Sequence, residues 1–325
     1  MQEIITLATE NLLSPVILCF ILGLAAALGR SDLSIPEAAA KMLSIYLLFA
    51  IGFKGGVSVA GHGLDATLGA TLLTGVALSA LLPFLAFALL RVLTRLDRVN
   101  AAAVAGHYGS ISIVTFLAGA NLLAQRGVDS EGYMVAVAAV MEAPAILSAL
   151  WLISRDGKSR LDAALYREIL LNGSIVLLVG AFFIGWITGQ QGMTRIEPFI
   201  GAPFQGVLCL FLLDMGLIAG RGLRRSWGAL GGGALAFGMV MPLLASAVGL
   251  GAASLLGLSL GGTVLMMILA ASASYIAVPA AMRVALPEAD PSIYLTLSLG
   301  VTFPFNLALG IPLYYAAALA VTGGA

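Results

Sequence analysis

Charged residues are scarce in this chain, and this scarcity excludes a soluble globular fold. Only 10% of its 325 residues are Asp, Glu, Lys or Arg, against roughly 25% in soluble domains. Hydrophobic residues make up 60% of the chain, and its mean hydropathy is +1.05. The 16 basic and 16 acidic residues balance, so nothing indicates nucleic acid as a partner. The lipid bilayer is the expected environment.

Basic residues are missing from the first ten positions, and cysteines are few. The opening "MQEIITLATE" carries Glu3 and Glu10 instead of the positive charges of a signal peptide. We therefore expect the first apolar stretch to be retained as a membrane span. Cys19 and Cys209 each lie within an apolar stretch, where packing is the expected role rather than a disulfide.

Apolar stretches long enough to cross a hydrocarbon core of ~30 Å recur along the whole chain. The sequence therefore predicts an all-α polytopic membrane protein with ten spans. They are expected near residues 12–29, 36–57, 66–92, 100–123, 132–154, 168–189, 198–220, 227–256, 260–284 and 292–321.

Lys and Arg residues are distributed unevenly between the two sides of these spans. With the N-terminus outside, thirteen of the sixteen fall on the cytoplasmic side, and only Lys54, Arg126 and Arg195 fall on the outer side. Cytoplasmic loops normally carry this excess. We expect a multi-pass protein of the inner (plasma) membrane with both termini periplasmic or extracellular.

The two halves of the sequence can be aligned with a nearly constant offset. "IYLLFAIGFKGG" matches "CLFLLDMGLIAG", which places Gly52 on Gly216, 164 residues later. "SISIVTFLAG" from Ser110 matches "SASYIAVPAA" from Ser272, 162 residues later. Chance similarity between apolar helices is the alternative. With five spans in each half, the second half is inverted in the membrane, as in many secondary transporters. The expected organisation is a first repeat over 1–154, a cytoplasmic linker over 155–167 and a second repeat over 168–325.

Two stretches place polar residues inside spans four and nine, at matching positions of the two halves. They are "GHYGSISIVTF", which begins at Gly106, and "ASASYIAVPAA", which begins at Ala271. Pro279 lacks an N–H group and disfavours a straight helix through the second stretch. Unpaired backbone groups cost several kcal/mol in lipid, so breaks are tolerated only where protein or water covers them. The sequence predicts broken helices in both spans.

Half-helix N-termini at these breaks favour a small oxyanion as the ligand. Each terminus acts as a partial positive charge of ~0.5 e, and Ser and Thr hydroxyls add hydrogen bonds without an Arg. The alternative is that the serines and glycines only allow helices to pack closely.

Few ionisable or amide side chains lie inside the spans, and each is a functional candidate. Glu142 lies in "MEAPA" of span five, and His107 lies at the start of the first break. Both are candidates for ion or proton coupling, with a satisfied buried polar group as the alternative. Asn306 follows Pro304 in span ten, where freed carbonyls could ligate a cation.

Two further ionisable residues lie in spans two and seven. Asp214 lies within span seven, where the matching position of the first half is Ala50. Lys54 lies in the glycine-rich end of span two, and we expect it to extend toward the outer interface.

The stretch "AASASYIAVPAAMRVALPEADPSIYLTLSLGVTFPFNLALGIPLY" resembles the sodium-dependent bicarbonate transporter family, known best from cyanobacteria. "GHYGSISIVTF", "MEAPA" and "IPEAAAKMLSIYLLFAIGFKGG" also resemble segments of that family. The resemblance implies a gate domain of spans one, two, six and seven, a core domain of the other six, and an elevator-like movement of the core. It also implies a homotrimer and, as in cyanobacteria, a PII-like regulatory protein.

The resemblance also implies site residues. Substrate and sodium would lie between spans four and nine, with sodium at Ser112, Thr115, Ser272 and Ser274. The substrate-binding candidates are Gly109, Ser110, Ser112, Thr115, Ser272, Ser274, Ala277 and Pro279.

One position departs from the family pattern. Cyanobacterial members carry an acidic residue directly after the second serine of this motif, and this chain has Tyr275 there. The departure removes a strong ligand for a hard cation. Glu142 matches an acidic family position and could supply part of the missing charge. Sodium and the proton are therefore both candidate coupling ions, with Tyr275, Glu142, His107 and Asn306 as the candidate coupling residues.

The expected function is secondary active uptake of bicarbonate coupled to sodium, with no cofactor beyond the coupling ion. The first alternative is a sodium- or proton-coupled symporter for another small anion, such as a short carboxylate. An intramembrane enzyme is disfavoured because the sequence has no His-Glu-x-x-His or Gly-x-Ser-x-Gly motif. A channel is disfavoured because no ring of charged residues or repeated filter loop is present.

Overall fold

The computed structural model describes residues 12–63, 66–154, 171, 173–226, 231–275, 278–279, 281–282 and 286–323. These residues form helices and connecting turns, with no strand among them. Within them, seven helices are long and apolar enough to cross a membrane. Three shorter apolar helices, Pro15–Leu28, Ile113–Gln125 and Leu260–Ala271, overlap the spans predicted as one, four and nine. The predicted class, an all-helical membrane protein, is confirmed.

Six helices are each continuous over most of a predicted span. The first, α2, begins where the Ser14 hydroxyl accepts a hydrogen bond from the Ile17 amide and Pro15 occupies the first helical position, a combination that favours helix initiation. α12 ends at Gly257, whose φ of 66° suits glycine. The six are α2 (Pro15–Leu28), α3 (Glu37–His62), α4 (Ala66–Leu93), α10 (Gly173–Ile200), α11 (Phe204–Ser226) and α12 (Gly232–Leu256).

The remaining predicted spans are interrupted or irregular. Span four is α5 (Arg98–His107) and α6 (Ile113–Gln125), span five is α7 (Met134–Val140) and α8 (Pro144–Ser154), and span nine begins as α13 (Leu260–Ala271). Span ten runs on without a gap but contains two π-helical segments. Its parts are α15 (Pro291–Leu295), η1 (Thr296–Thr302), α16 (Phe303–Phe305), η2 (Asn306–Gly310) and α17 (Ile311–Thr322).

Span six ends near its predicted residue, and span seven is shifted by six residues, to Phe204–Ser226. α10 consists of two helical pieces joined across a kink, because Gly189 has a non-helical backbone with a positive φ of 53°. After this kink, Met193 and Ile196 pack against the cluster of Ala50, Phe53 and Ile200. The segment predicted as a loop is therefore a short amphipathic helical piece.

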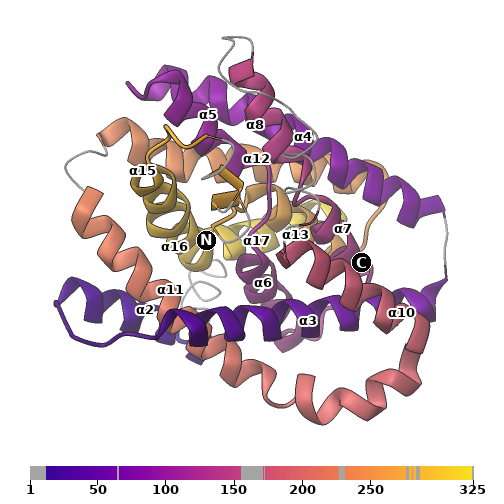
Figure 1. The fold of residues 1–325 in the computed structure, drawn as a ribbon. Coiled ribbons are helices and arrows are strands. Elements are labelled where there is room, and N and C mark those ends of the chain that lie inside the picture. Colours follow the sequence, from indigo (N-terminus) through magenta and orange to yellow (C-terminus); the bar gives the residue numbers. More distant parts are fainter. Residues whose placement is uncertain are drawn as a thin grey trace.

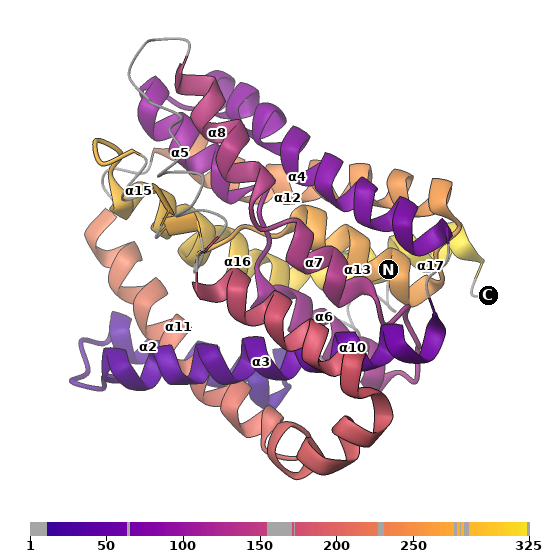
Figure 2. The same cartoon turned by 45° about the vertical axis from the view of Figure 1, so that its right-hand side comes forward.

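Four helices form two close pairs along one side of the molecule, α2 with α11 and α3 with α10 (Figures 1 and 2). Glycines permit these approaches. A Cβ atom on Gly52 of α3 would lie 2.5 Å from the Leu178 carbonyl oxygen of α10, and one on Gly216 of α11 would lie 2.8 Å from the Leu24 nitrogen of α2. We call α2, α3, α10 and α11 the paired-helix group. α4 and α12 lie on the opposite side, with α6, α13 and α17 between (Figure 2).

Cys19 of α2 and Cys209 of α11 lie side by side within one of these pairs. Both are free, and their thiol groups lie close enough to interact electrostatically.

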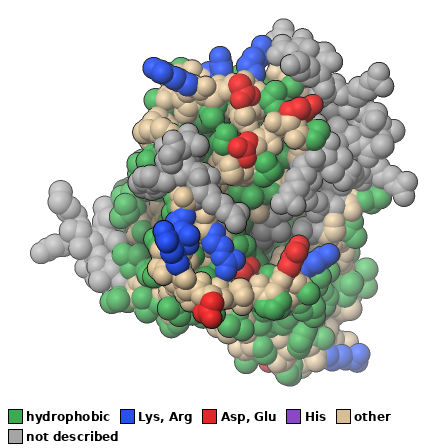
Figure 3. Space-filling model, turned by 60° about the vertical axis from the view of Figure 1, so that its left-hand side comes forward, with side chains coloured by type: hydrophobic (Ala, Val, Ile, Leu, Met, Phe, Trp, Pro, Cys, Tyr) green, Lys and Arg blue, Asp and Glu red, His purple; other side chains and the backbone are tan. Residues whose placement is uncertain are grey.

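Charged side chains gather at the end of the molecule where α3 begins. Figure 3 views this end and shows basic and acidic side chains around a hollow, with hydrophobic side chains over the flank. The exposed basic residues of this end that the structure describes include Lys41, Arg95, Arg98, Arg221 and Arg224.

Candidate functional site

The first break separates two capped half-helices. α5 begins at Asp97, whose carboxylate accepts a hydrogen bond from the Asn100 amide at 2.9 Å, and it ends at His107. The chain is non-helical up to Ser112, where α6 begins. The Ser112 hydroxyl oxygen accepts from both the amide (3.2 Å) and the hydroxyl (2.9 Å) of Thr115. A side chain at this position that satisfies a free N–H group is a typical helix start.

The second break has the same construction. α13 begins at Ser259, whose hydroxyl accepts from the Gly262 amide at 3.1 Å, and it ends at Ala271. After the break, the Ser274 hydroxyl accepts from the Val278 amide at 3.4 Å. Pro279 follows as a buried helical residue. The predicted site residue Ala277 lies outside the described residues.

The capping residues of the two spans correspond in sequence. Asp97 caps α5 and Ser259 caps α13, the half-helices that precede the breaks. These two residues are 259 − 97 = 162 positions apart. Ser112, which caps α6, and Ser274, whose hydroxyl accepts from the Val278 amide, are 274 − 112 = 162 positions apart. This is the offset between the two polar stretches of the sequence.

Hydrogen bonds join the two breaks directly. The Ser112 amide donates to the Ser272 hydroxyl at 2.9 Å, and the Ser274 amide donates to the His107 carbonyl at 2.7 Å. The Ser272 hydroxyl donates in turn to the Leu269 carbonyl at 3.0 Å. These serines are at most 3% exposed. The structure thus brings Ser112, Thr115, Ser272 and Ser274 together at one crossing.

Two buried backbone donors remain at this crossing. Ile113 and Val114 occupy the first two positions of α6, where a helix provides no carbonyl partner. No described residue accepts a hydrogen bond from either amide. Their side chains are 5% and 0% exposed, so the crossing presents N–H groups that a ligand can satisfy.

Glu142 is connected to the first break through Ser110. The Ser110 hydroxyl lies 3.3 Å from a Glu142 carboxylate oxygen, and both residues are buried. Glu142 lies where span five is interrupted between α7 and α8, next to Pro144 as the sequence predicts. The Glu142 carboxylate thus contacts Ser110, which lies two residues before the capping residue Ser112.

Gly109 and the helix prolines fit the breaks to their neighbours. Pro83 leaves the Ser79 carbonyl, four residues earlier, without its helical partner. A Cβ atom on Gly109 would lie 2.6 Å from this carbonyl oxygen, so only glycine fits there. In the second half, Pro242 frees the Gly238 carbonyl, which accepts from the Thr302 hydroxyl at 2.6 Å.

Sequence reasoning missed the contacts of these freed carbonyls. Thr302 also receives a hydrogen bond at 2.7 Å from the Tyr108 hydroxyl in the first break. The Ser79 hydroxyl donates to the Met141 carbonyl at 2.7 Å and accepts from the Ala145 amide at 3.1 Å, which repairs the interruption of span five. The sequence does contain a signal for these contacts, because a proline inside a helix leaves the carbonyl four residues before it without a helical hydrogen bond.

His107 and Asn306 are held by protein partners. The Nδ1 atom of His107 lies 2.7 Å from the Ala103 carbonyl, its ring stacks on Tyr294 with centroids 4.5 Å apart, and Nε2 has no partner among the described residues. The Asn306 amide donates to the Ala271 carbonyl at 3.0 Å and accepts from the Tyr314 hydroxyl at 2.8 Å. Asn306 therefore positions the end of α13 at the second break.

A cavity of about 820 Å³ lies between the paired-helix group and the second break. Tyr275 and Pro279 line its inner part, and Glu37 and Lys41 of α3 lie at the charged end of the molecule. The Tyr275 ring packs edge-on against Phe303 with centroids 5.3 Å apart. Its hydroxyl is buried, makes no hydrogen bond of normal geometry within the described part of the chain, and interacts electrostatically with Ser112. The ring thus stands between the cavity and the cap hydroxyls.

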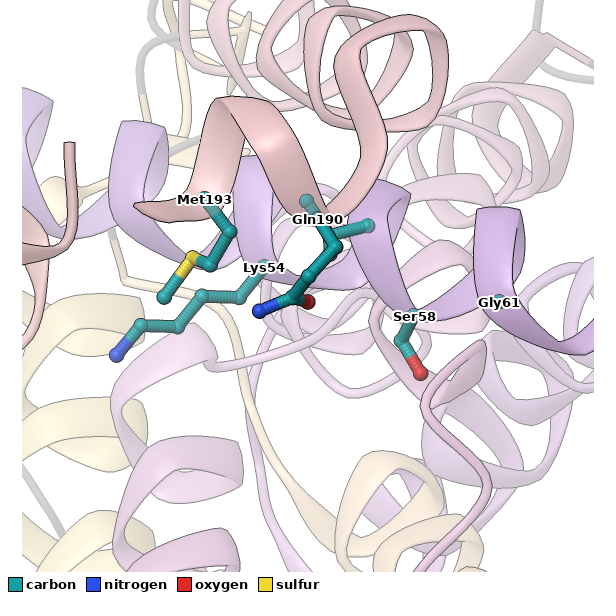
Figure 4. Close-up of a pocket in the computed structure, with 6 residues that line it drawn as sticks. Lys54, Ser58, Gly61, Gln190 and Met193 are labelled. Carbon is teal, nitrogen blue, oxygen red and sulfur yellow. The ribbon is translucent and has the colours of Figure 1, made fainter. Parts of the chain in front are cut away.

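A second, shallower pocket of about 500 Å³ lies near the other end of α3 (Figure 4). Lys54 extends along it away from Ser58 and Gly61, beneath Gln190 and Met193 of α10. Its ammonium group lies 4.6 Å from the centre of the Phe204 ring. This contact holds the cation against α11.

These features define the class: an all-helical membrane protein whose buried polar site is built from two crossing broken helices, an arrangement used by secondary transporters. A family model described as the Na+-dependent bicarbonate transporter superfamily matches residues 15–319. The chain belongs to this superfamily, which confirms the resemblance seen in the sequence. A search of curated proteins found no match.

Proposed function

We propose that this protein is a secondary active transporter that takes up bicarbonate together with sodium. The observation that carries the proposal is the crossing of two capped half-helices, where backbone donors of Ile113 and Val114 have no partner among the described residues. Helix N-termini favour anions through their dipole and free N–H groups. The hydroxyl groups at the crossing suit a small oxyanion such as bicarbonate.

Two inverted repeats account for the matched construction of the breaks. The caps recur at an offset of 162. The paired-helix group is consistent with the same symmetry. Gly52 of α3 approaches Phe182 of α10, and Gly216 of α11 approaches Phe20 of α2, which lies 182 − 20 = 162 positions earlier. We propose ten spans in two repeats, with the paired-helix group as the gate domain and the other helices as the core domain.

An elevator-like movement of the core past the gate would carry the crossing across the membrane. The cavity beside Tyr275 would then be the path to one side. That side is the cytoplasm under the positive-inside rule, because Lys41 lines the cavity and the exposed Arg95 and Arg224 fall on the side that the sequence predicts as cytoplasmic. The proposed location is the inner membrane with both termini outside. A homotrimer and a PII-like regulator are further proposals from the family.

Sodium is the proposed coupling ion. The hydroxyl oxygens of Ser112, Thr115, Ser272 and Ser274 offer neutral ligands, and Glu142 places a carboxylate beyond Ser110. A second candidate is proton-coupled transport of a short carboxylate. The aromatic ring of Tyr275 favours it, because it makes the cavity lining less polar.

Uptake into proteoliposomes tests the proposal. Radiolabelled bicarbonate is offered with an inward sodium gradient, with an equal choline gradient, and with a proton gradient alone. Sodium-dependent accumulation is the expected result. Flux without any gradient dependence would overturn secondary transport. Competition by unlabelled formate or acetate, with flux driven by protons alone, would select the second candidate.

A further inference from the structure

Asp214 is a buried carboxylate that the proposed transport site does not use. It lies in the middle of α11 on the wall of the cavity, and its side chain is 4% exposed. It makes no hydrogen bond or ion pair of ordinary distance with any described residue. A carboxylate in a membrane span is costly unless it is paired, so its presence indicates a function.

The neighbouring charges do not neutralise Asp214 by contact. Arg221 acts on it through space, but seven residues of helix place the two about 10 Å apart along the axis. The Arg221 guanidinium donates to the Leu33 carbonyl at 2.9 Å instead. Glu37 and Lys41, at the mouth of the cavity, are exposed and of opposite sign. A positive charge entering the cavity therefore meets a carboxylate that no described residue pairs with by contact.

The matching position of the first half shows that helix packing does not require a carboxylate. Ala50 of α3 corresponds to Asp214, since 214 − 164 = 50. Ala50 is fully buried and packs with Phe53 and Ile200. The same place in the fold is thus a packed alanine in one half and a cavity-lining aspartate in the other.

The surroundings of Asp214 favour a monovalent cation. Calcium takes six to eight oxygen ligands and usually several carboxylates, whereas no group of three or more His, Cys, Asp or Glu occurs among the described residues. One carboxylate balances one positive charge, and the cavity wall adds the neutral hydroxyl of Ser44.

We propose that Asp214 binds a monovalent alkali cation in the cavity, on the paired-helix group and separate from the crossing of the breaks. The binding itself does not depend on which anion is carried. A role for this site in binding the coupling cation as it leaves the core rests on the proposed function. A cation that leaves the core would meet Asp214 on its way to the cavity mouth.

Thermal unfolding of the purified full chain, without bicarbonate, tests the proposal. NaCl is titrated against choline chloride at constant ionic strength. For the wild type, sodium should raise the unfolding temperature more than choline does. Asp214→Asn should raise the half-saturating sodium concentration by about tenfold or more, the loss expected for one interaction with a charged group. Glu37→Gln, at the cavity mouth, is the matched control and should behave as the wild type.

Other outcomes separate this site from the crossing. An unchanged sodium response in Asp214→Asn, together with its loss in Ser112→Ala, would place the cation at the breaks and overturn the proposal. Should Asp214→Asn not purify, Asp214→Glu moves the carboxylate by one methylene and should alter the half-saturating concentration; no alteration would also overturn it. An Asp214-dependent sodium response without bicarbonate flux would support this site while the proposed substrate fails.

Discussion

At the scale of single residues, Ser272 and Ser274 have different tasks in one break. The Ser272 hydroxyl accepts from the Ser112 amide and so ties the two breaks together. The Ser274 hydroxyl accepts from the amide of Val278, the residue directly before Pro279. Neither task uses a charge, so the site depends on the directions of a few hydroxyl and amide groups.

The double variant Ser272→Ala with Ser274→Ala should therefore lose transport while still reaching the membrane. Loss of a cap and of one buried hydrogen bond costs about 1–3 kcal/mol together, which a large helical protein tolerates. Bicarbonate uptake and expression are measured in parallel. Ser254→Ala, an exposed serine of α12, is the control and should transport normally. Uptake retained in the double variant would place the site elsewhere.

Removal of the Tyr275 hydroxyl should have different effects on the unfolding temperature and on transport. Its hydroxyl has no hydrogen-bond partner of normal geometry among the described residues, and an unsatisfied buried group costs about 1–3 kcal/mol. Tyr275→Phe should thus unfold at the same or a higher temperature without substrate, yet transport more weakly. We expect the Tyr275 hydroxyl to donate a hydrogen bond to the anionic substrate. Its loss should raise the half-saturating substrate concentration by about tenfold, the value for one charge-assisted hydrogen bond.

Tyr108→Phe is the comparison for this variant. It removes a hydroxyl that bonds to Thr302, so it should lower the unfolding temperature. A Tyr275→Phe protein that is less stable than the wild type without substrate would contradict the argument, since the hydroxyl would then have a structural partner.

At the scale of helices, glycines determine how closely the paired-helix group packs. Gly52→Ala would place a Cβ atom 2.5 Å from the Leu178 carbonyl oxygen, so α3 and α10 must separate, at a cost of about 1–3 kcal/mol. Gly61, in the same helix, has open space around its Cβ position. Gly61→Ala should stabilise the helix by about 0.5–1 kcal/mol. Unfolding temperatures of the two variants should move in opposite directions.

The start of α5 gives a dependence on pH. Partial burial acts to raise the pKa of the Asp97 carboxyl, but hydrogen bonds from the Asn100 amide and side chain outweigh it and hold the pKa below its usual value. A lowered folded-state pKa contributes stability above the unfolded pKa, and this contribution is lost as the pH falls through the folded one. Wild type should therefore exceed Asp97→Asn in unfolding temperature at pH 7.

This difference should shrink as the solution is acidified through the usual range for aspartate, about pH 4. Unfolding temperatures of the two proteins are compared over that range. A constant difference at every pH would mean that the charge of Asp97 contributes nothing to the cap.

At the scale of the whole molecule, the sequence predicts the membrane class, the breaks and their partners better than the ends of helices. Ser112 and Ser272 could be expected to meet, because they lie in the two polar stretches that the sequence aligns with one offset. The second helical piece of α10, after the kink at Gly189, could not be expected, because it depends on how Met193 and Ile196 pack on α3. The roles of Asn306 and Thr302 were also hidden, since each partner lies on another helix.

The adjacent thiols of Cys19 and Cys209 allow a test of which helices move relative to one another during transport. An elevator carries its cargo on one rigid body while the other stays still, so a covalent link inside the stationary body leaves the cycle intact. Mild oxidation with copper phenanthroline should join α2 to α11 through these thiols, and uptake should continue in the cross-linked protein. A cycle that stops on cross-linking, and restarts on reduction, would mean that the pair of helices itself must come apart with every anion carried.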